Sequence, residues 1–470
     1  MSHLSARLLL LVALLNGSPV LAQAIEPAKD LPGAQSPEPK ANALTLSQLI
    51  ELARARDPRA GQATAQLEGA QAKRDEVGLA WFPVIEVTGA IAGPSPDARL
   101  NGPNGGDDNQ NLFDLRTPHG WGTLGAAFRA QANAVIPIYS FGKWAAGKAA
   151  TEHYVGFNEA LLARARDQAT FDITRAFWGY QTAHAGTLSI DAVRKRLTDA
   201  QKTAATLLAE ESEQVSKNDA LKLDYLREEI EAQYAATVKN ERLAYNGIKA
   251  LIGSEPAATP VIEQRTLPAA FEVPDHDQML QRAFDHRPEA KAAHEGVAAR
   301  QGLVDLERAR LYPDVAVVAG ATFTYTTNAS NPNSPFVYDP YNDRSAYLAL
   351  AVRGTLDFPQ KLARVRQAEA DLHEAQALAR GAEQLIRFEL EQALNDLTEA
   401  KVRVDRYSKE AAIAKQLALT AGIAFEGGLG EARELLEDTL LFARADGERL
   451  KALFDAQIGL ASLARAVGGL

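Results

Sequence analysis

Four segments of the chain carry apolar residues at every second position, a pattern typical of β-strands that have one apolar and one polar face. The longest alternation covers residues 124–138, where the even positions are apolar and Arg129, Gln131 and Asn133 lie between them. The other three segments alternate in the same way. Together they predict strands near residues 84–93, 122–138, 314–327 and 345–358.

After each pair of strands the hydrophobic pattern changes to a helical period. Residues 143–214 contain no proline, so they predict one helix, which at 1.5 Å per residue would be on the order of 100 Å long. Residues 361–425 predict its counterpart, with an alanine-rich seam whose members are three or four residues apart, as in a coiled coil. Each long helix ends in a polar or glycine-rich turn, and a second helix follows. The chain therefore predicts two long antiparallel helical hairpins, over residues 143–251 and 361–467.

The two sets of elements are copies of one another. Residues 46–90 align with residues 276–320 without a gap at an offset of 230, so that Asp57-Pro58 falls on Arg287-Pro288. Such a long repeat indicates a duplicated domain rather than a short-period solenoid. We therefore predict a first structural repeat at 44–253 and a second at 275–470, joined by a proline-rich and polar linker at 254–274.

The N-terminus carries Arg7, an apolar run over residues 8–15 and small residues before Gln23, which predicts an export signal peptide at 1–24 followed by a linker at 25–43. The apolar run is too short for a transmembrane helix, and no later stretch is long enough. A mature chain that crosses a membrane would therefore do so as a barrel. The sequence has no cysteine, so disulfides, thiolate metal sites and an acylated N-terminal cysteine are excluded, and the protein is predicted not to be lipid-anchored.

The net charge and the missing catalytic motifs argue against several classes of function. The net charge of −10 argues against a nucleic-acid partner. The sequence has no glycine-rich nucleotide loop with lysine, no nucleophile elbow and no set of metal ligands, and its eight histidines are scattered. We therefore predict no catalytic residues, no cofactor and no metal, and a protein that is not an enzyme.

Aromatic residues gather at the junctions between helices and strands, as in the interfacial girdle of an outer-membrane barrel. Four strands leave two open edges, and membrane barrels need about eight strands or more, so the barrel would be shared among subunits. A soluble sandwich is the alternative reading of the alternation. The predicted membrane-interface aromatics are Trp81, Phe82, Tyr139, Phe141, Tyr312 and Phe358.

The signal peptide, the duplication, the paired strands and the paired helical hairpins together resemble the TolC-like outer-membrane efflux protein family, or outer-membrane factors. The resemblance covers the chain from about Leu44 to the C-terminus. It implies a mixed α and β membrane protein: a homotrimer whose subunits each give four strands to one 12-stranded outer-membrane β-barrel, continued by a long α-helical periplasmic tunnel of antiparallel coiled-coil hairpins. It also implies outer-membrane lipids, a periplasmic adaptor and an inner-membrane pump as partners.

The same resemblance implies a channel entrance at the tip of the second hairpin, formed by Phe425, Gly428, Glu434 and Glu437. The spacing of the two glutamates places both on one helix face, so threefold symmetry would make two carboxylate rings, whereas the alternative is two ordinary solvated residues. In the departures from the family pattern, Gly430 stands where a basic residue can occur and Lys222 where an acid can occur. The adaptor-docking tips implied by the resemblance are Ser216, Asp219, Gly428 and Leu429.

The expected function is an outer-membrane exit duct of a tripartite efflux or type I secretion system, with passive transport from a periplasmic adaptor and pump to the outside. The alternative is a periplasmic coiled-coil structural or adaptor protein that is not inserted in the membrane. The sequence does not distinguish drug, metal or protein cargo.

Overall fold

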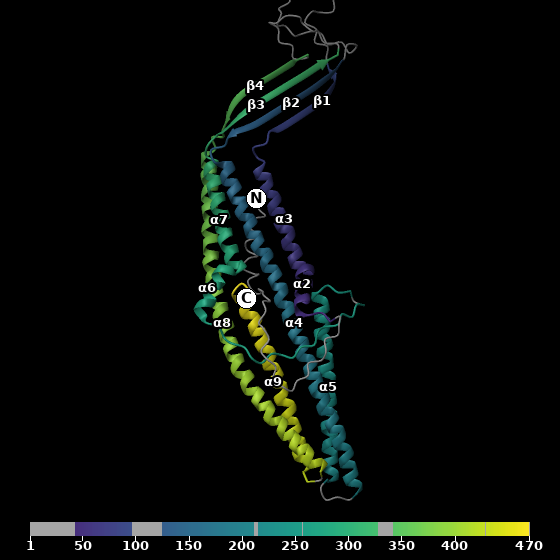
Figure 1. The fold of residues 1–470 in the computed structure, drawn as a ribbon. Coiled ribbons are helices and arrows are strands. Elements are labelled where there is room, and N and C mark those ends of the chain that lie inside the picture. The colour runs from purple at the N-terminus through teal and green to yellow at the C-terminus, as the bar shows by residue number, and fades with distance from the viewer. Residues whose placement is uncertain are drawn as a thin grey trace, which may run out of the picture. The chain divides into compact units, whose positions relative to one another are not determined.

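The computed structural model describes residues 43–95, 125–210, 215–255, 257–327, 342–427 and 429–469 (Figure 1). The predicted signal peptide and most of the linker after it lie outside these residues, as do most of the two long loops between paired strands. The chain forms two compact units. The first consists of Met1–Gly69, Val155–Gly296 and Gln376–Leu470, and the second of Ala70–Tyr154 and Val297–Ala375. Each unit takes segments from both sequence repeats, so the division into repeats stays a prediction about the sequence.

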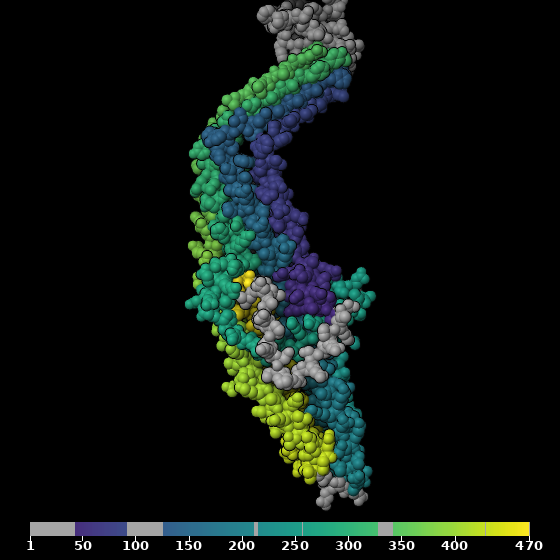
Figure 2. Space-filling view, viewed as in Figure 1, coloured from purple at the N-terminus to yellow at the C-terminus, as the bar shows by residue number. Residues whose placement is uncertain are grey.

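The second unit holds an antiparallel sheet in the order β1-β2-β3-β4. The strands are β1 (Val84–Ser95), β2 (Gly125–Tyr139), β3 (Asp314–Thr326) and β4 (Arg344–Arg353). In Figure 2 the blue atoms of the first two strands lie beside the green atoms of the last two. Within the part of the chain that the structure describes, β1 and β4 are the two edges of this sheet.

The register separates an apolar face from a polar face, and this alternation was predicted from the sequence. Val87, Ala132, Ala321 and Ala346 are paired across the four strands, and the next row is Thr88, Gln131, Thr322 and Ser345. Side chains of neighbouring rows point to opposite faces. Large residues on the apolar face, among them Ile85, Val87, Leu348 and Leu350, are exposed to solvent in the single chain. The sheet therefore presents a broad apolar surface that no described element covers.

One predicted strand extends too far. The fourth strand was predicted near residues 345–358, but β4 ends at Arg353 and α8 already begins at Phe358. Pro359 is compatible with the first turn of a helix because its missing N–H would have no partner there. The carbonyl of Asp357 accepts the N–H of Lys361 at 3.1 Å, which starts the helix three residues before the predicted Lys361.

The first unit contains most of two long hairpins. The first hairpin is α4 (Lys143–Ala209) with α5 (Lys217–Leu251), and the second is α8 (Phe358–Glu426) with α9 (Ala432–Ala466). The long helix predicted over 143–214 thus ends at Ala209. Among the helices of the described residues, none has a stretch long and apolar enough to span a membrane. The seam predicted in the second hairpin is buried, including Leu390, Leu397 and Val404.

A short helix followed by a longer one precedes the strands of each repeat. These are α2 (Leu46–Arg56) and α3 (Pro58–Gly78) in the first repeat, and α6 (His276–His286) and α7 (Pro288–Ala309) in the second. Each pair is interrupted at one residue before a proline, Asp57 or Arg287, which has extended backbone angles. A residue before proline disfavours the helical conformation. We call these two places the first and the second helix break.

The linker between the repeats is ordered and packs on helices of both hairpins. Gln181 of α4 donates to the carbonyl of Glu263 at 2.7 Å and accepts the N–H of Arg265 at 2.9 Å. Gln457 of α9 donates to the carbonyl of Pro268 at 3.0 Å. Ile262 is buried in a cluster with residues of α2, α4 and α5. The linker therefore belongs to the hydrogen-bonded core of the first unit, although its composition suggested only a connection.

We expect Gly302→Ala to destabilise the protein. A Cβ atom at Gly302 of α7 would lie 2.8 Å from the Cα atom of Ala150 in α4, so the two helices would have to separate. Overpacking of this kind costs about 1–3 kcal/mol. The matched control is Gly69→Ala in α3, where a Cβ atom meets nothing within 4 Å and helix propensity favours alanine. Denaturant unfolding of the two purified variants should therefore shift in opposite directions, and equal shifts would contradict the close approach of α4 and α7.

Candidate functional site

The tip of the second hairpin is a tight turn. The carbonyl of Ala424 accepts the N–H groups of Leu429 at 2.8 Å and of Gly430 at 2.9 Å. A Cβ atom at Gly430 would lie 2.9 Å from the Cβ atom of Ala424 and 3.0 Å from the backbone nitrogen of Phe425. The turn folds back so closely on the end of α8 that position 430 has no room for a side chain. This contact explains why glycine stands where the family can carry a basic residue.

Phe425, predicted at the channel entrance, is a core residue of this tip. Its side chain is 1% exposed and packs in a cluster with residues of both hairpins, among them Leu197, Leu223 and Leu435. The ring of Phe425 therefore packs inside the tip and is not exposed on the surface of the single chain. Gly428, the second predicted entrance residue, lies outside the described residues.

Glu434 and Glu437 lie in the first turns of α9 and are both exposed. Leu435 and Leu436 between them are buried, so the two carboxylates project away from the cluster around Phe425. The Nε atom of Arg433 donates to Glu437 at 2.8 Å, and this hydrogen bond raises the pKa of Arg433. The shared face suits a carboxylate ring, but the lining role of these residues stays a prediction.

The first hairpin tip begins α5 with a capping box. The Ser216 hydroxyl accepts the N–H of Asp219 at 3.1 Å, and the Asp219 carboxylate accepts the N–H of Ser216 at 3.2 Å. Hydrogen bonds from Ser216 and then from Lys222 lower the pKa of Asp219. A serine at this position is thus explained by helix capping. Leu429 at the other tip is 92% exposed. The docking role of both tips stays a prediction.

The predicted interface aromatics lie at the helix-strand junctions of the second unit and are exposed. Phe141 stacks on Tyr312 at 5.6 Å between ring centroids and meets Tyr139 edge-on at 4.7 Å. Trp81 and Phe82 contact each other at 6.2 Å. Phe358 begins α8, with Lys361 over its ring. The structure brings these residues to one end of the sheet, whereas their contact with lipid remains a prediction.

A second aromatic group, missed in the sequence, occupies the other end of the apolar face. Phe128 and Tyr325 are paired across β2 and β3, and Phe323 lies on the same face two positions away. The guanidinium of Arg344 lies 5.5 Å from the centroid of the Phe323 ring. Their even spacing within the alternating segments was visible in the sequence, but their alignment depends on the register between strands.

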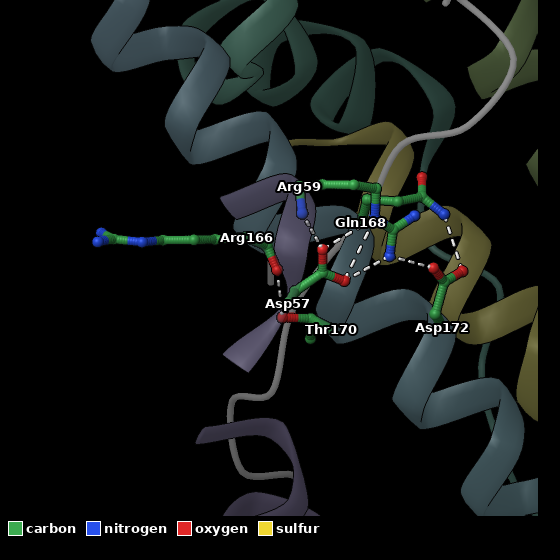
Figure 3. A network of polar contacts seen from close by, with 6 residues as sticks. All are labelled: Asp57, Arg59, Arg166, Gln168, Thr170 and Asp172. Carbon is green, nitrogen blue, oxygen red and sulfur yellow. Dashed lines mark hydrogen bonds and ion pairs between the residues drawn. The ribbon is translucent and has the colours of Figure 1, made fainter. Parts of the chain in front are cut away.

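The first helix break carries a network of ion pairs that the sequence analysis did not single out (Figure 3). Arg59 donates to both carboxylate oxygens of Asp57, with its closest contact at 2.6 Å, and reaches Asp172 of α4 at 2.6 Å. Gln168 donates to Asp172 at 2.8 Å. Burial alone would raise the pKa of Asp57, but hydrogen bonds from Arg59 outweigh it and lower that pKa. The network joins the start of α3 to the middle of α4.

The second helix break has the same construction with the charges exchanged. At the offset of 230, Asp57 corresponds to Arg287 and Arg59 to Glu289. Arg287 contacts Glu289 at 3.4 Å and Glu389 of α8 at 2.5 Å. Its side chain is 2% exposed, against 47% for Arg59. The opposite charges at positions 57 and 59 versus 287 and 289 are the sequence signal that could have identified both networks.

The second break is part of a larger group of charges, which we call the charge node. Arg164 of α4 contacts Glu289 at 3.3 Å, and Arg465 near the end of α9 interacts electrostatically with Glu389, Arg287, Glu289 and Arg164. Burial raises the pKa of Asp167 to about 7, with Arg54 opposing the shift and Glu289 adding to it. The node comprises Arg54, Arg164, Asp167, Arg287, Glu289, Glu389 and Arg465.

The antiparallel sheet and the two helical hairpins define a fold of the outer-membrane channel class. The outer-membrane channel OprN matches with a TM-score of 0.72 and 18% identity, covering 96% of this chain and 99% of that chain. The outer membrane protein VceC from Vibrio cholerae matches with a TM-score of 0.71 and 18% identity, over 90% and 96%. The CmeC outer membrane channel of Campylobacter jejuni matches with a TM-score of 0.70 and 13% identity, over 96% and 94%. At these sequence identities the structural matches show a shared fold alone.

A sequence match to a protein family covers part of the chain. Residues 279–469 match the outer membrane efflux protein family, whereas no curated protein matches the chain. This sequence match lies in the second repeat, the fold match covers nearly the whole chain, and both agree with the resemblance to outer-membrane efflux proteins. The matched structures are channels rather than enzymes, so the prediction that the protein is not an enzyme is confirmed on this ground.

We expect Arg287→Met to cost far more stability than Arg59→Met. Removing the almost fully buried Arg287 leaves Glu289 and Glu389 with less compensation in the node, a loss of about 3–5 kcal/mol. Arg59 is half exposed, so solvent screens its carboxylates and the loss should be about 1 kcal/mol. Denaturant unfolding of both purified variants measures the difference. Equal losses would show that the two breaks are energetically equivalent despite their different burial.

We expect Asp167→Asn to stabilise the protein at high pH. Because the pKa of Asp167 is raised to about 7 in the folded state, its ionisation opposes folding, and this cost grows from about pH 4 to pH 7 and stays constant above. The asparagine variant should be more stable than the parent at pH 8, by no more than about 4 kcal/mol, and equal to it near pH 4. Unfolding measured across this range tests the sign. The exposed Asp75→Asn serves as the control.

Proposed function

We propose that the protein is the outer-membrane exit duct of a tripartite efflux or type I secretion system, and that transport through it is passive. The observation that carries this proposal is the sheet of the second unit. It has one exposed apolar face and two edges, and a sheet of four strands in this state is not stable in water alone. Three copies would close it into a 12-stranded barrel with the apolar face toward lipid.

Exposed apolar side chains on the long helices support a homotrimer. Phe388, Val402, Ile413 and Ile423 of α8 are all exposed in the single chain. Apolar residues spread along one helix at this density favour burial against another surface. Neighbouring copies in a threefold assembly would supply that surface, and two hairpins per subunit would form the wall of a periplasmic tunnel.

The hairpin tips are proposed as the periplasmic entrance and the docking surface for an adaptor, which would connect the duct to an inner-membrane pump. Leu429 at one tip and Ser216 at the other are exposed and suited to contact a partner. Glu434 and Glu437 would form carboxylate rings around the entrance. The cargo class is left open between drugs, metal ions and proteins. We also propose that a signal peptide at 1–24 directs export and that the protein carries no lipid anchor.

The function is tested by fractionation and a matched pair of variants. The protein should be found in outer membranes as a trimer whose migration in gel electrophoresis changes on heating, and a soluble periplasmic monomer would favour the adaptor alternative instead. Leu350→Arg places a charge on the apolar face and should impair assembly by roughly 2–4 kcal/mol if that face meets lipid near the midplane. Thr322→Arg on the polar face should be tolerated, and equal tolerance of both would argue for a soluble sheet.

We expect the double variant Glu434→Gln/Glu437→Gln to reduce cation selectivity in planar bilayers, because carboxylate rings favour cations at a pore entrance. The control is Glu228→Gln/Glu231→Gln, which removes two glutamates at the same spacing from α5. Reversal potentials in a salt gradient measure both. Unchanged selectivity in the first variant would remove Glu434 and Glu437 from the entrance.

A further inference from the structure

The helix α5 carries a second apolar stripe opposite the one that it buries. Leu223, Leu226 and Ile230 pack in a cluster with residues of α4, α8 and α9. On the opposite face, positions three or four residues apart are all exposed. The exposed large apolar residues that the structure describes in α5 all lie on this face. We call it the α5 stripe, and its members are Leu221, Tyr225, Glu229, Ala232, Ala236, Lys239, Leu243, Asn246 and Ala250.

The part of α8 near the second hairpin tip carries a stripe of the same spacing. Leu390, Leu397 and Val404 are buried where α8 packs against α9. The opposite face of α8 is exposed, and its positions follow one another, read from the tip, by the same order of four- and three-residue steps as in the α5 stripe. We call it the α8 stripe, and its members are Leu417, Ile413, Lys409, Arg406, Val402, Glu399, Asn395, Gln392 and Phe388.

The two stripes belong to different sides of the first unit. In Figure 1, α5 and the part of α8 after Gln376 lie on opposite sides of this unit, with α9 between them. Because both stripes are exposed, they do not pack on each other within one chain. Phe425 at the end of α8 and Leu223 at the start of α5 share one cluster, so both hairpin tips lie at the same end. The two helices therefore run in opposite directions, and rotation about an axis along them would bring α5 of one copy antiparallel to α8 of the next.

Aligned antiparallel, the two stripes are complementary in charge and in apolar character. Opposite charges face each other in two places, where Glu229 meets Lys409 and Lys239 meets Glu399. Most other positions pair two apolar residues or two amides. These pairs are Leu221 with Leu417, Tyr225 with Ile413, Ala236 with Val402, Ala250 with Phe388 and Asn246 with Gln392. The pairs that join an apolar residue to a polar one are Ala232 with Arg406 and Leu243 with Asn395.

The charges favour this register over its neighbours. A shift of one heptad in one direction would place Lys239 opposite Arg406, which repel each other, and a shift in the other direction would place Lys239 opposite Gln392. Both opposite-charge pairs are lost in either case. Exposed ion pairs contribute little to stability, so burial of the apolar members would supply most of the free energy of association, whereas the charges select the register.

We propose that the α5 stripe of one copy packs against the α8 stripe of a second copy, in the register that pairs Glu229 with Lys409 and Lys239 with Glu399. The contact is head-to-tail, because each copy offers a different helix to each neighbour, and such a contact closes into a ring when it is repeated. The inference rests on the proposed homotrimer and adds the surface and the register through which the copies meet.

The test is disulfide trapping in outer membranes of cells that produce the full-length chain, which has no cysteine of its own. Oxidation of Ala236→Cys/Val402→Cys should give covalent dimers and trimers on denaturing gels, because the two positions face each other across the contact. The matched control is Leu243→Cys/Val402→Cys, which moves one thiol by one heptad, or about 10 Å, and should give no such bands. Ala236→Cys alone should also give none, since the contact is head-to-tail.

The outcomes separate this inference from the proposed duct. Cross-linking of the control pair in place of Ala236 and Val402 would overturn the register. A trimer in the outer membrane that neither pair cross-links, or cross-links to a different protein, would overturn the proposed surface and leave the duct standing. A soluble periplasmic monomer would overturn both.

Charge reversal gives a second measurement that needs no cross-link. Lys239→Glu or Glu399→Lys alone places like charges at the contact and should lower the temperature at which the purified trimer dissociates by a few degrees, whereas the two together should restore it. Arg242→Glu makes the same reversal on an exposed position of α5 outside the stripe and should leave this temperature unchanged. A combined variant no more stable than the single ones would overturn the pairing.

Discussion

Ion pairs at the two helix breaks connect the interrupted helices of the first unit to its long helices. Each repeat interrupts a helix at a residue before proline, and the interruption removes the continuous hydrogen bonding that would fix the direction of the next helix. An arginine at each break connects it to a carboxylate on a long helix, Asp172 of α4 or Glu389 of α8. Each break is therefore connected to a long helix by a few charges.

The exchanged charges make the two breaks similar in shape but different in chemistry. In the first, a carboxylate occupies the position before proline and the arginine follows two residues later, partly in solvent. In the second, the arginine itself is buried before the proline, and it brings with it Glu289, Arg164 and Arg465. The arginine of the first break is therefore half exposed, whereas that of the second is almost fully buried.

The sequence predicted the elements with regular periods and missed what depends on contacts between them. The two faces of the sheet and the long hairpins follow from alternation and from proline-free runs, which are local properties. The end of β4 at Arg353 was not predicted, because apolar residues continue the alternation into the helix that begins at Phe358. The burial of Phe425 was also missed, since a family pattern locates a position along the chain but not the neighbours of its ring. Apart from the exchanged charges at the two breaks, the charge node joins residues far apart in the sequence and has no local signature.

The linker between the predicted repeats is a hydrogen-bonded part of the first unit rather than a simple connection. Hydrogen bonds from Gln181 and Gln457 hold the linker from opposite repeats, and Leu44 pairs with Val261 and Glu263 on its first part. Both hairpins therefore contribute side-chain partners to the linker, and Leu44 contributes its backbone groups. Removing the linker would leave the buried side-chain amides of Gln181 and Gln457 without these hydrogen-bond partners. The linker backbone therefore serves both hairpins as a shared hydrogen-bond partner.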